Sequence, residues 1–314
     1  MDVNASPSTR TPADGGSKLW VRFGIVAAAA VVVLLLLVLG SRWLVTLESV
    51  QEFLRTYPGH TPLPAGTAEG LPAWLGWQHF LNMFFLFLII KTGWQVRTQQ
   101  RPPANWTRNN KGLVKTRNPP KRISINLWFH LTLDALWVLN GLVFMVLIFA
   151  TGHWVRIVPT SWDVFPNAVS AGLQYLSLNW PMENGWVNYN SLQLLAYFAT
   201  VFIAAPLAIA TGLRMSEAWP KKAAVNAVYP IELARAIHLP TMVYFVLFVV
   251  AHVALVLATG ARANLNHMFA ARSDDGWMGF WVFAAAVVVS AAAVVFTRPM
   301  VIAPIANLMG RVSR

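Results

Sequence analysis

The sequence predicts an all-α integral membrane protein with six transmembrane helices. Of its 314 residues, 56% are hydrophobic and only 11% are charged, whereas a soluble domain has about 25% charged residues. The hydrophobic residues gather into six segments, each long enough for the roughly 20 residues of helix that cross a bilayer. These segments are residues 23–45, 74–96, 126–150, 191–213, 237–259 and 277–297.

The two ends of the chain flank this membrane region. Residues 1–22 are polar and rich in helix breakers, which predicts a disordered leader. Segment 23–45 is interpreted as an uncleaved anchor helix, because its apolar run is long and no small-residue cleavage pattern follows it. Residues 298–314 form a tail after the sixth segment.

Loop charge predicts the orientation. Residues 97–122 hold eight basic residues and no acidic one, and residues 214–235 are also basic. By the positive-inside rule both loops are cytoplasmic, and so are the leader and the tail. We therefore predict a multi-pass protein of the bacterial cytoplasmic membrane with both termini in the cytoplasm. The net charge of +12 is explained by these loops and by membrane lipid, so no nucleic-acid partner is predicted.

Residue types and motifs that do not occur in the sequence limit the kinds of redox chemistry that the chain could carry out. The chain has no cysteine, which excludes disulfides, thiolate zinc sites, iron–sulfur clusters and covalent c-type haem attachment. No GxGxxG fingerprint and no P-loop occurs, so the chain lacks a recognisable module for hydride transfer. Any redox role is then expected to move electrons singly.

Four of the seven histidines lie within or at the edge of a predicted span. His60, His153 and His267 fall in outer loops and are interpreted as polar residues at a wet interface. An ionisable residue inside a span is instead a functional-site hypothesis, although a lone histidine is more often a satisfied core residue. The four in the spans are His79, His130, His238 and His252.

Helix geometry sorts these four histidines into two pairs. His238 and His252 are fourteen residues apart, so they lie about 21 Å apart along one helix face. Because neighbouring spans run in opposite directions, His79 reaches the level of His252 and His130 the level of His238. Two imidazoles from facing helices suit a haem iron, each giving one nitrogen while the other N–H finds a partner. The sequence therefore predicts two b-type haems, and iron as the metal.

Glycines and basic residues near the predicted haems are further candidates. Gly93 lies near the level of the inner haem and Gly141 near that of the outer haem, where a porphyrin edge needs clearance; glycine is also simply frequent in membrane helices. Haem propionates need cations, and these residues are equally interpreted as topology determinants. The candidate cations are Lys121, Arg122, Arg214 and Arg235 for the inner haem and Arg156 for the outer one.

Three acidic residues are candidates for proton transfer. Asp134 lies four residues after His130 on nearly the same helix face and is predicted to orient a ligand, to carry quinone protons or to bond a neighbouring helix. The outer loop 155–190 is predicted to hold a short interfacial helix across the outer haem, with Asp163 and Glu183 as proton acceptors at a quinol pocket. An aromatic belt is the alternative for this loop.

The order of these histidines resembles one protein family. The segments GWQHFLNMFFLFLIIKTGWQVRTQQRP, LWFHLTLDALWVLNG and ARAIHLPTMVYFVLFVVAHV, within residues 74–260, resemble the bacterial di-haem cytochrome b superfamily of b561 type. Its members include the membrane subunits of formate dehydrogenase (gamma), thiosulfate reductase and nickel–iron hydrogenase. The resemblance implies a four-helix haem bundle with segments 23–45 and 277–297 packed outside. It also implies electron transfer between the quinone/quinol pool and a partner oxidoreductase.

The resemblance favours a molybdopterin-dependent partner over a hydrogenase, and implies the same four histidine ligands. Two features differ from the family pattern: a helix precedes the bundle, and loop charge starts the first ligand helix outside. Which membrane face carries the partner is therefore left open. Two other functions remain as alternatives. One is a stand-alone transmembrane haem reductase; the other is a haem-free proton-coupled transporter, which the lack of internal repeats disfavours.

Overall fold

The protein is a multi-pass membrane protein built from six long apolar helices. The computed structural model describes residues 15–110, 119–180, 184–217, 219–220 and 224–314. Its six helices long and apolar enough to cross a membrane confirm the predicted spans to within a few residues. They are Trp20–Leu44, Ala73–Thr98, Ile125–Ala150, Ser191–Met215, Ile231–Ala258 and Met278–Phe296.

Twelve α-helices and three short strands make up the described chain. The membrane helices are α1 (Gly15–Leu44), α3 (Ala73–Thr98), α4 (Ile125–Ala150), α6 (Ser191–Phe198) with α7 (Ala205–Met215), α9 (Ile231–Ala258) and α11 (Met278–Phe296). The shorter helices are α2 (Glu48–Thr56), α5 (Val164–Leu176), α8 (Val225–Val228), α10 (Ala261–Ala270) and α12 (Pro299–Asn307). The strands are β1 (Asn105–Arg108), β2 (Arg122–Ser124) and β3 (Gly310–Ser313).

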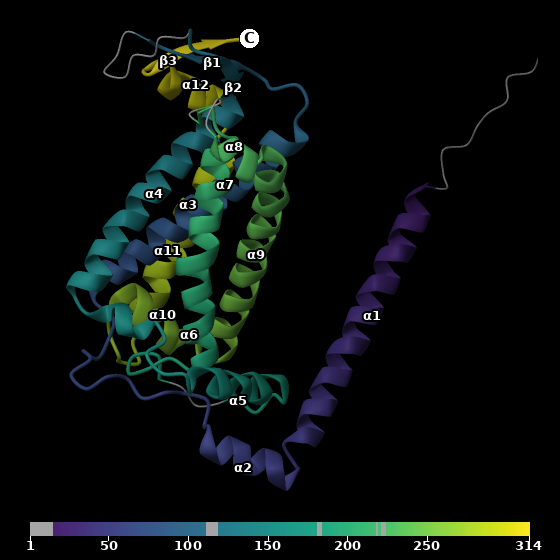
Figure 1. The fold of residues 1–314 in the computed structure, drawn as a ribbon, viewed down its shortest axis with the longest axis vertical. Coiled ribbons are helices and arrows are strands. Elements are labelled where there is room, and N and C mark those ends of the chain that lie inside the picture. Colours follow the sequence, from purple (N-terminus) through teal and green to yellow (C-terminus); the bar gives the residue numbers. More distant parts are fainter. Residues whose placement is uncertain (1–14, 111–118, 181–183, 218, 221–223) are drawn as a thin grey trace, which may run out of the picture.

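Four of the membrane helices form two antiparallel pairs. α3 packs along α4 and α7 packs along α9, whereas among the described helices neither member of one pair packs extensively on the other pair. In Figure 1, α3 and α4 stand on one side of the bundle and α7 and α9 on the other. α11 packs on α3, and α10 joins α9 to α3 and α11. Side chains of α3, α4 and α9 line a cavity between the two pairs.

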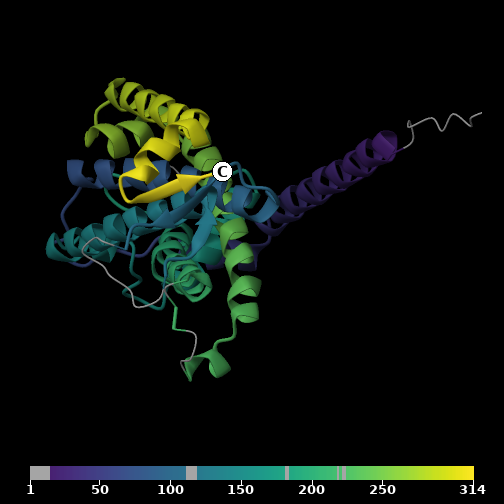
Figure 2. The same cartoon turned by 90° about the horizontal axis from the view of Figure 1, so that it is seen from above.

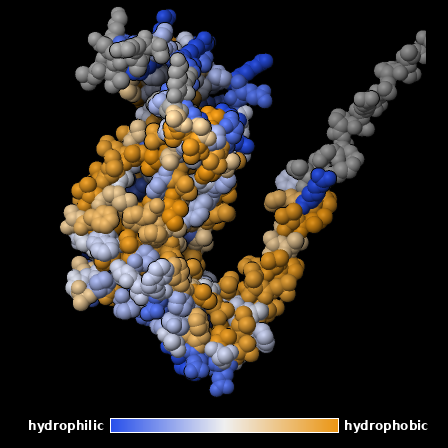
Figure 3. Space-filling model, in the orientation of Figure 1, coloured by the Kyte–Doolittle hydropathy of each residue, from blue (hydrophilic) through white to orange (hydrophobic). Residues whose placement is uncertain are grey.

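The first helix stands apart from this bundle. Figures 1 and 2 both show α1 separated from the other membrane helices, with a contact to α5 at one end. No part of the apolar window of α1 is buried. Figure 3 shows apolar residues covering the sides of the bundle and hydrophilic residues at its two ends, which is the surface expected of a protein in contact with lipid.

The fourth span is irregular beside its proline. Between α6 and α7 lies a π-helical turn, η2 (Ala199–Ala204), and Pro206 follows in the first turn of α7. Proline has no N–H, and its ring crowds the carbonyl four residues earlier, so a regular α-helix cannot continue through it. The wider turn accommodates the irregularity at Pro206.

The outer loop contains the predicted short helix. α5 lies across one end of the bundle, beside α2 (Figure 1). It begins after Asp163, and its buried residues include Val164, Ala168 and Ala171. The short helix predicted within residues 155–190 is therefore present, while its location at the membrane interface stays a prediction.

A small sheet closes the opposite end of the bundle. β1 is the central strand and pairs antiparallel with β2 and with β3, so that Trp106 lies opposite Ile123 on one side and Val312 on the other. The Trp106 Nε1–H donates to the carbonyl of Ala306 at 2.9 Å. We call β1–β3 and α12 the inner cap. These residues are predicted from the sequence to be loop and tail, so the three short strands depart from the all-α prediction.

Candidate functional site

The outer pair of histidines lies together between the two helix pairs. The ring centres of His79 on α3 and His252 on α9 are 6.1 Å apart, with their planes inclined by 51°. A metal ion held between two imidazoles places the ring centres about 6 Å apart, because each metal–nitrogen bond is about 2 Å long and each ring centre lies about 1 Å behind its nitrogen. The spacing therefore fits a pair of axial ligands.

These two histidines line a largely apolar cavity. Its volume is about 320 Å³, at the lower end of the roughly 300–1,000 Å³ typical of ligand pockets. The ring of Phe248 stacks on His252 at 5.6 Å with an interplanar angle of 4°, and Phe269 meets His79 edge-on at 5.4 Å. Aromatic packing thus holds both imidazoles in place. The lining also includes Leu75, Met83, Trp137, Phe144, Phe245 and Phe283.

Three buried polar atoms of residues that line this cavity have no hydrogen-bond partner within the described chain. They are His79 Nδ1, Gln78 Oε1 and Arg156 Nε. Leaving a buried polar atom unpaired costs about 1–3 kcal/mol, so such atoms in a native protein call for an explanation. A ligand with polar groups of its own is one such explanation.

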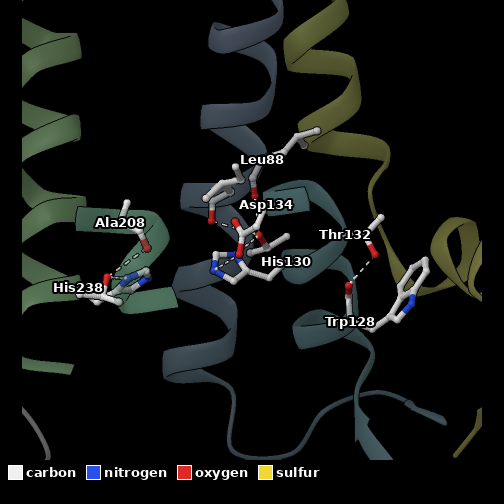
Figure 4. Close-up of polar contacts among 10 residues, drawn as sticks. Leu88, Trp128, His130, Thr132, Asp134, Ala208 and His238 are labelled. Atoms are coloured by element: carbon white, nitrogen blue, oxygen red, sulfur yellow. Dashed lines mark hydrogen bonds and ion pairs between the residues drawn. The ribbon is translucent and has the colours of Figure 1, made fainter. Parts of the chain in front are cut away.

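The inner pair lies at the opposite end of the bundle, toward the inner cap. Figure 4 shows His130 on α4 and His238 on α9 at one height, facing the same gap. Each ring also contacts a threonine of the adjacent helix. Thr92 Oγ1 lies 3.0 Å from His130 Nδ1, and Thr211 Oγ1 lies 2.8 Å from His238 Nδ1. Neither threonine was predicted, although each is part of a Thr-Gly dipeptide in a membrane helix.

The glycine predictions have different outcomes. A Cβ on Gly93 would lie 3.2 Å from the His130 ring, and one on Gly212, which was not predicted, 3.8 Å from the His238 ring. Gly93 therefore allows the His130 ring to approach α3 closely, whereas the distance at Gly212 is that of an ordinary van der Waals contact. The porphyrin clearance predicted for Gly93 stays a prediction. A Cβ on Gly141 would meet no atom within 4 Å, so its role in clearing a porphyrin edge stays a prediction.

The two acidic candidates that the structure describes lie in different parts of the molecule. Asp134 Oδ2 lies 3.6 Å from His130 Nε2, beyond hydrogen-bond distance but close enough to influence the inner pair electrostatically. Asp163 is exposed at the start of α5 and does not line the outer cavity. Glu183 lies outside the described residues. Of the two that the structure describes, Asp134 is the one that lies beside a histidine pair.

Arg156 is buried at the outer end, with 3% of its surface exposed. It belongs to the 3-10 turn η1 (His153–Arg156). Its guanidinium donates to the carbonyls of Gly185 at 2.8 Å and Trp186 at 3.1 Å, and more weakly to those of Ala68 and Gly70. It also lines the outer cavity. Arg156 thus joins three outer segments, while its predicted contact with a propionate stays a prediction.

The cations predicted for the inner haem lie around the end of the bundle that carries the inner cap. Arg122 donates to the carbonyl of Arg314 at 2.9 Å, and Arg214 Nε donates to the carbonyl of Tyr229 at 2.7 Å. Lys121 pairs with Glu217 at 2.8 Å. Arg235 is exposed on α9, three residues before His238. Each remains a candidate for a propionate, and Arg235 lies nearest in sequence to an inner ligand.

One histidine of the outer loops differs from its prediction. His267 on α10 is only 8% exposed, and its ring centre lies 5.5 Å from that of Trp186. Burial, and then the charge of Arg156, lower the pKa of His267. The wet interface predicted for this residue is therefore wrong. The helix that carries it, α10, packs on α3, α9 and α11, and His267 is buried there.

Within the described residues, no group of three or more histidine or acidic side chains gathers around one point. A haem requires only two axial ligands from the protein, which the outer pair can provide. No protein-family model matches this sequence, and no curated protein or solved structure matches it either. The candidate site therefore stands on the geometry of its own residues.

Proposed function

We propose that this protein is a di-haem membrane cytochrome b that passes electrons between the quinone/quinol pool and a partner oxidoreductase. The observation that supports it most is the outer pair: His79 and His252, 6.1 Å apart, both line a cavity of about 320 Å³ between two helix pairs. A molybdopterin-dependent enzyme is the preferred partner, on the family resemblance of the sequence. The protein would anchor that partner to the membrane.

In this proposal, two b-type haems are assigned to these residues. His79 and His252 would hold the outer iron, and His130 and His238 the inner one. Bound haem supplies one-electron transfer. The protein contributes the ligand nitrogens, the aromatic contacts of Phe248 and Phe269 that fix the outer rings, and an apolar lining that excludes water. Asp134 is the candidate for carrying a proton next to the inner pair.

Two sites at different depths suit electron transfer across a membrane. His238 and His252 lie on one helix, fourteen residues apart, which corresponds to a rise of about 21 Å in a hydrocarbon core of about 30 Å. Electrons could thus cross most of the bilayer in one internal step. In the proposed orientation, the inner cap and both termini face the cytoplasm of a bacterium, as the basic loops favour.

Histidine variants of the purified protein test this proposal. We expect His79→Ala and His252→Ala each to bind one b-type haem per chain instead of two, with the inner haem retained. His130→Ala and His238→Ala should do the opposite. His60→Ala is the matched control, since His60 is exposed in an outer loop, and should retain both haems.

The result that would contradict the pairing is loss of both haems, or of neither, in the His79 and His252 variants. A wild-type protein without haem would favour the proton-coupled transporter. A haem protein that purifies without a partner and reduces a small acceptor such as ferric iron would favour the stand-alone reductase.

A further inference from the structure

We infer that Thr92 and Thr211 are positioning residues that fix the tautomer and ring orientation of the inner ligands His130 and His238. The inference rests on the proposed function, because it assigns these histidines to a haem iron. It concerns two residues on two different helices, α3 and α7, that make the same set of contacts. Both threonines are almost fully buried, with 2% and 1% of their surface exposed.

Each threonine hydroxyl lies between a backbone carbonyl and an imidazole. Thr92 Oγ1 is 2.8 Å from the carbonyl of Leu88, one turn earlier, and 3.0 Å from His130 Nδ1. Thr211 Oγ1 is 2.6 Å from the carbonyl of Leu207 and 2.8 Å from His238 Nδ1. In both cases the shorter contact is to the carbonyl.

Counting protons then gives the tautomer of the histidines. A hydroxyl has one proton to donate, and a carbonyl can only accept. With that proton on the shorter bond to the carbonyl, the hydroxyl oxygen accepts from Nδ1–H of the imidazole. The proton of each neutral ring is therefore on Nδ1, and Nε2 carries the lone pair. This is the tautomer in which Nε2 is available to a metal ion.

The residue after each threonine places the ring. The inner rings approach Gly93 and Gly212 through Cε1, the carbon between the two ring nitrogens, at 3.2 and 3.8 Å from the position of a Cβ. At Gly93 a side chain would displace the ring from the adjacent hydroxyl. Threonine and glycine together thus define where the ring lies as well as which nitrogen carries its proton.

In the outer pair, His79 has no such hydroxyl partner. His79 Nδ1 is buried and has no hydrogen-bond partner within the described chain. A hydrogen bond from Nδ1–H raises the basicity of the other ring nitrogen, and a more basic ligand stabilises ferric over ferrous iron. The threonines should therefore lower the midpoint potential of the inner haem without acting on the outer one.

Valine variants test the inference, because valine has nearly the shape of threonine but no hydroxyl. In Thr92→Val and Thr211→Val we expect the midpoint potential of the inner haem to rise, and its ferric EPR signal to shift as the ligand ring rotates. The outer haem should be unchanged. Thr92→Ser and Thr211→Ser keep the hydroxyl and should restore both properties.

Thr132→Val is the matched control. Thr132 Oγ1 also donates to a carbonyl one turn earlier, that of Trp128 at 2.9 Å, and Figure 4 shows this contact pointing away from the inner histidines. This variant loses the same intrahelical bond and should leave both potentials as in the wild type.

Unchanged inner potential and EPR signal in both valine variants, with two haems bound, would overturn the inference and leave the proposed function standing. An equal shift in Thr132→Val would also overturn it. If a valine variant fails to accumulate, Thr92→Ala and Thr211→Ala remove the same acceptor and are judged by the same criterion. Absence of haem from the wild-type protein would instead overturn the proposed function.

Discussion

At the scale of single residues, Asp134 is an acidic residue that lies beside a candidate ligand. Its Oδ2 lies 3.6 Å from His130 Nε2, so a negative charge here would stabilise ferric iron. We predict that Asp134→Asn raises the midpoint potential of the inner haem in a redox titration. Asp163→Asn, at an exposed position on the outer side, is the control and should have no effect. An unchanged inner potential in Asp134→Asn would contradict this role.

His267 should make folding stability depend on pH. Its pKa in the folded protein lies below its ordinary value of 6.5, mainly because it is buried. The unfolded chain therefore binds a proton more readily, and the stabilising contribution is complete above pH 6.5 and is lost as the pH falls toward the lowered pKa. We predict that thermal unfolding temperatures decrease more steeply between pH 7.5 and 5.5 in the wild type than in His267→Gln. Parallel profiles would show that this residue does not contribute.

At the scale of structural elements, Arg156 connects the turn η1 to two other outer segments. Its guanidinium supplies the donors for four backbone carbonyls, and hydrogen bonds to charged groups contribute about 1.5–3 kcal/mol each, without being additive. We predict that Arg156→Ala lowers the thermal unfolding temperature by several degrees. Arg156→Lys should recover only part of this loss, because lysine lacks the planar fork. Full recovery by lysine would mean that charge alone matters.

The sequence predicts features that depend on one helix alone, but not those that depend on how helices pack together. Long apolar runs are a local signal, so all six spans were found, and regular helix geometry was enough to pair His79 with His252. The contacts of Thr92 and Thr211 depend on how neighbouring helices are rotated, which no local pattern reveals. The backbone carbonyls that Arg156 contacts come from outer loops whose path cannot be read from the sequence. The sequence therefore suggested only a propionate as its partner.

The inner cap was missed for a similar reason. Each of its strands is only three or four residues long, and β1 pairs with β3 across about two hundred residues of sequence. Short strands without a clear alternation are poorly marked, and pairing between such distant segments leaves no trace in either one. The burial of Trp106 on Ala306 is thus known only from the fold.

At the scale of the whole molecule, the inner cap joins the start of the bundle to its end. Its core contains Trp106, Trp128 and Ile302. Trp106→Ala should destabilise the cap by about 3–5 kcal/mol and speed hydrogen exchange in residues 299–313, while the haem content stays unchanged. Trp162→Ala, at a site 84% exposed, is the control. If exchange in the tail is unaffected, the cap is not held by this tryptophan.

The bundle as a whole is arranged around the space between its two helix pairs. α3 with α4 and α7 with α9 each pack closely, while the four histidines lie at two levels on their facing sides. A ligand between the pairs would supply the contacts that the helices do not make with each other. Binding should therefore stabilise the whole bundle, since a ligand held only by the folded state raises its stability.

The most direct test of this account is the dithionite-reduced minus oxidised spectrum of the purified wild-type protein, with haem quantified per chain. The account predicts two b-type haems per chain. One haem would mean that one of the two histidine pairs does not bind iron. A protein that binds no haem, even when expressed with an ample haem supply, would contradict the account.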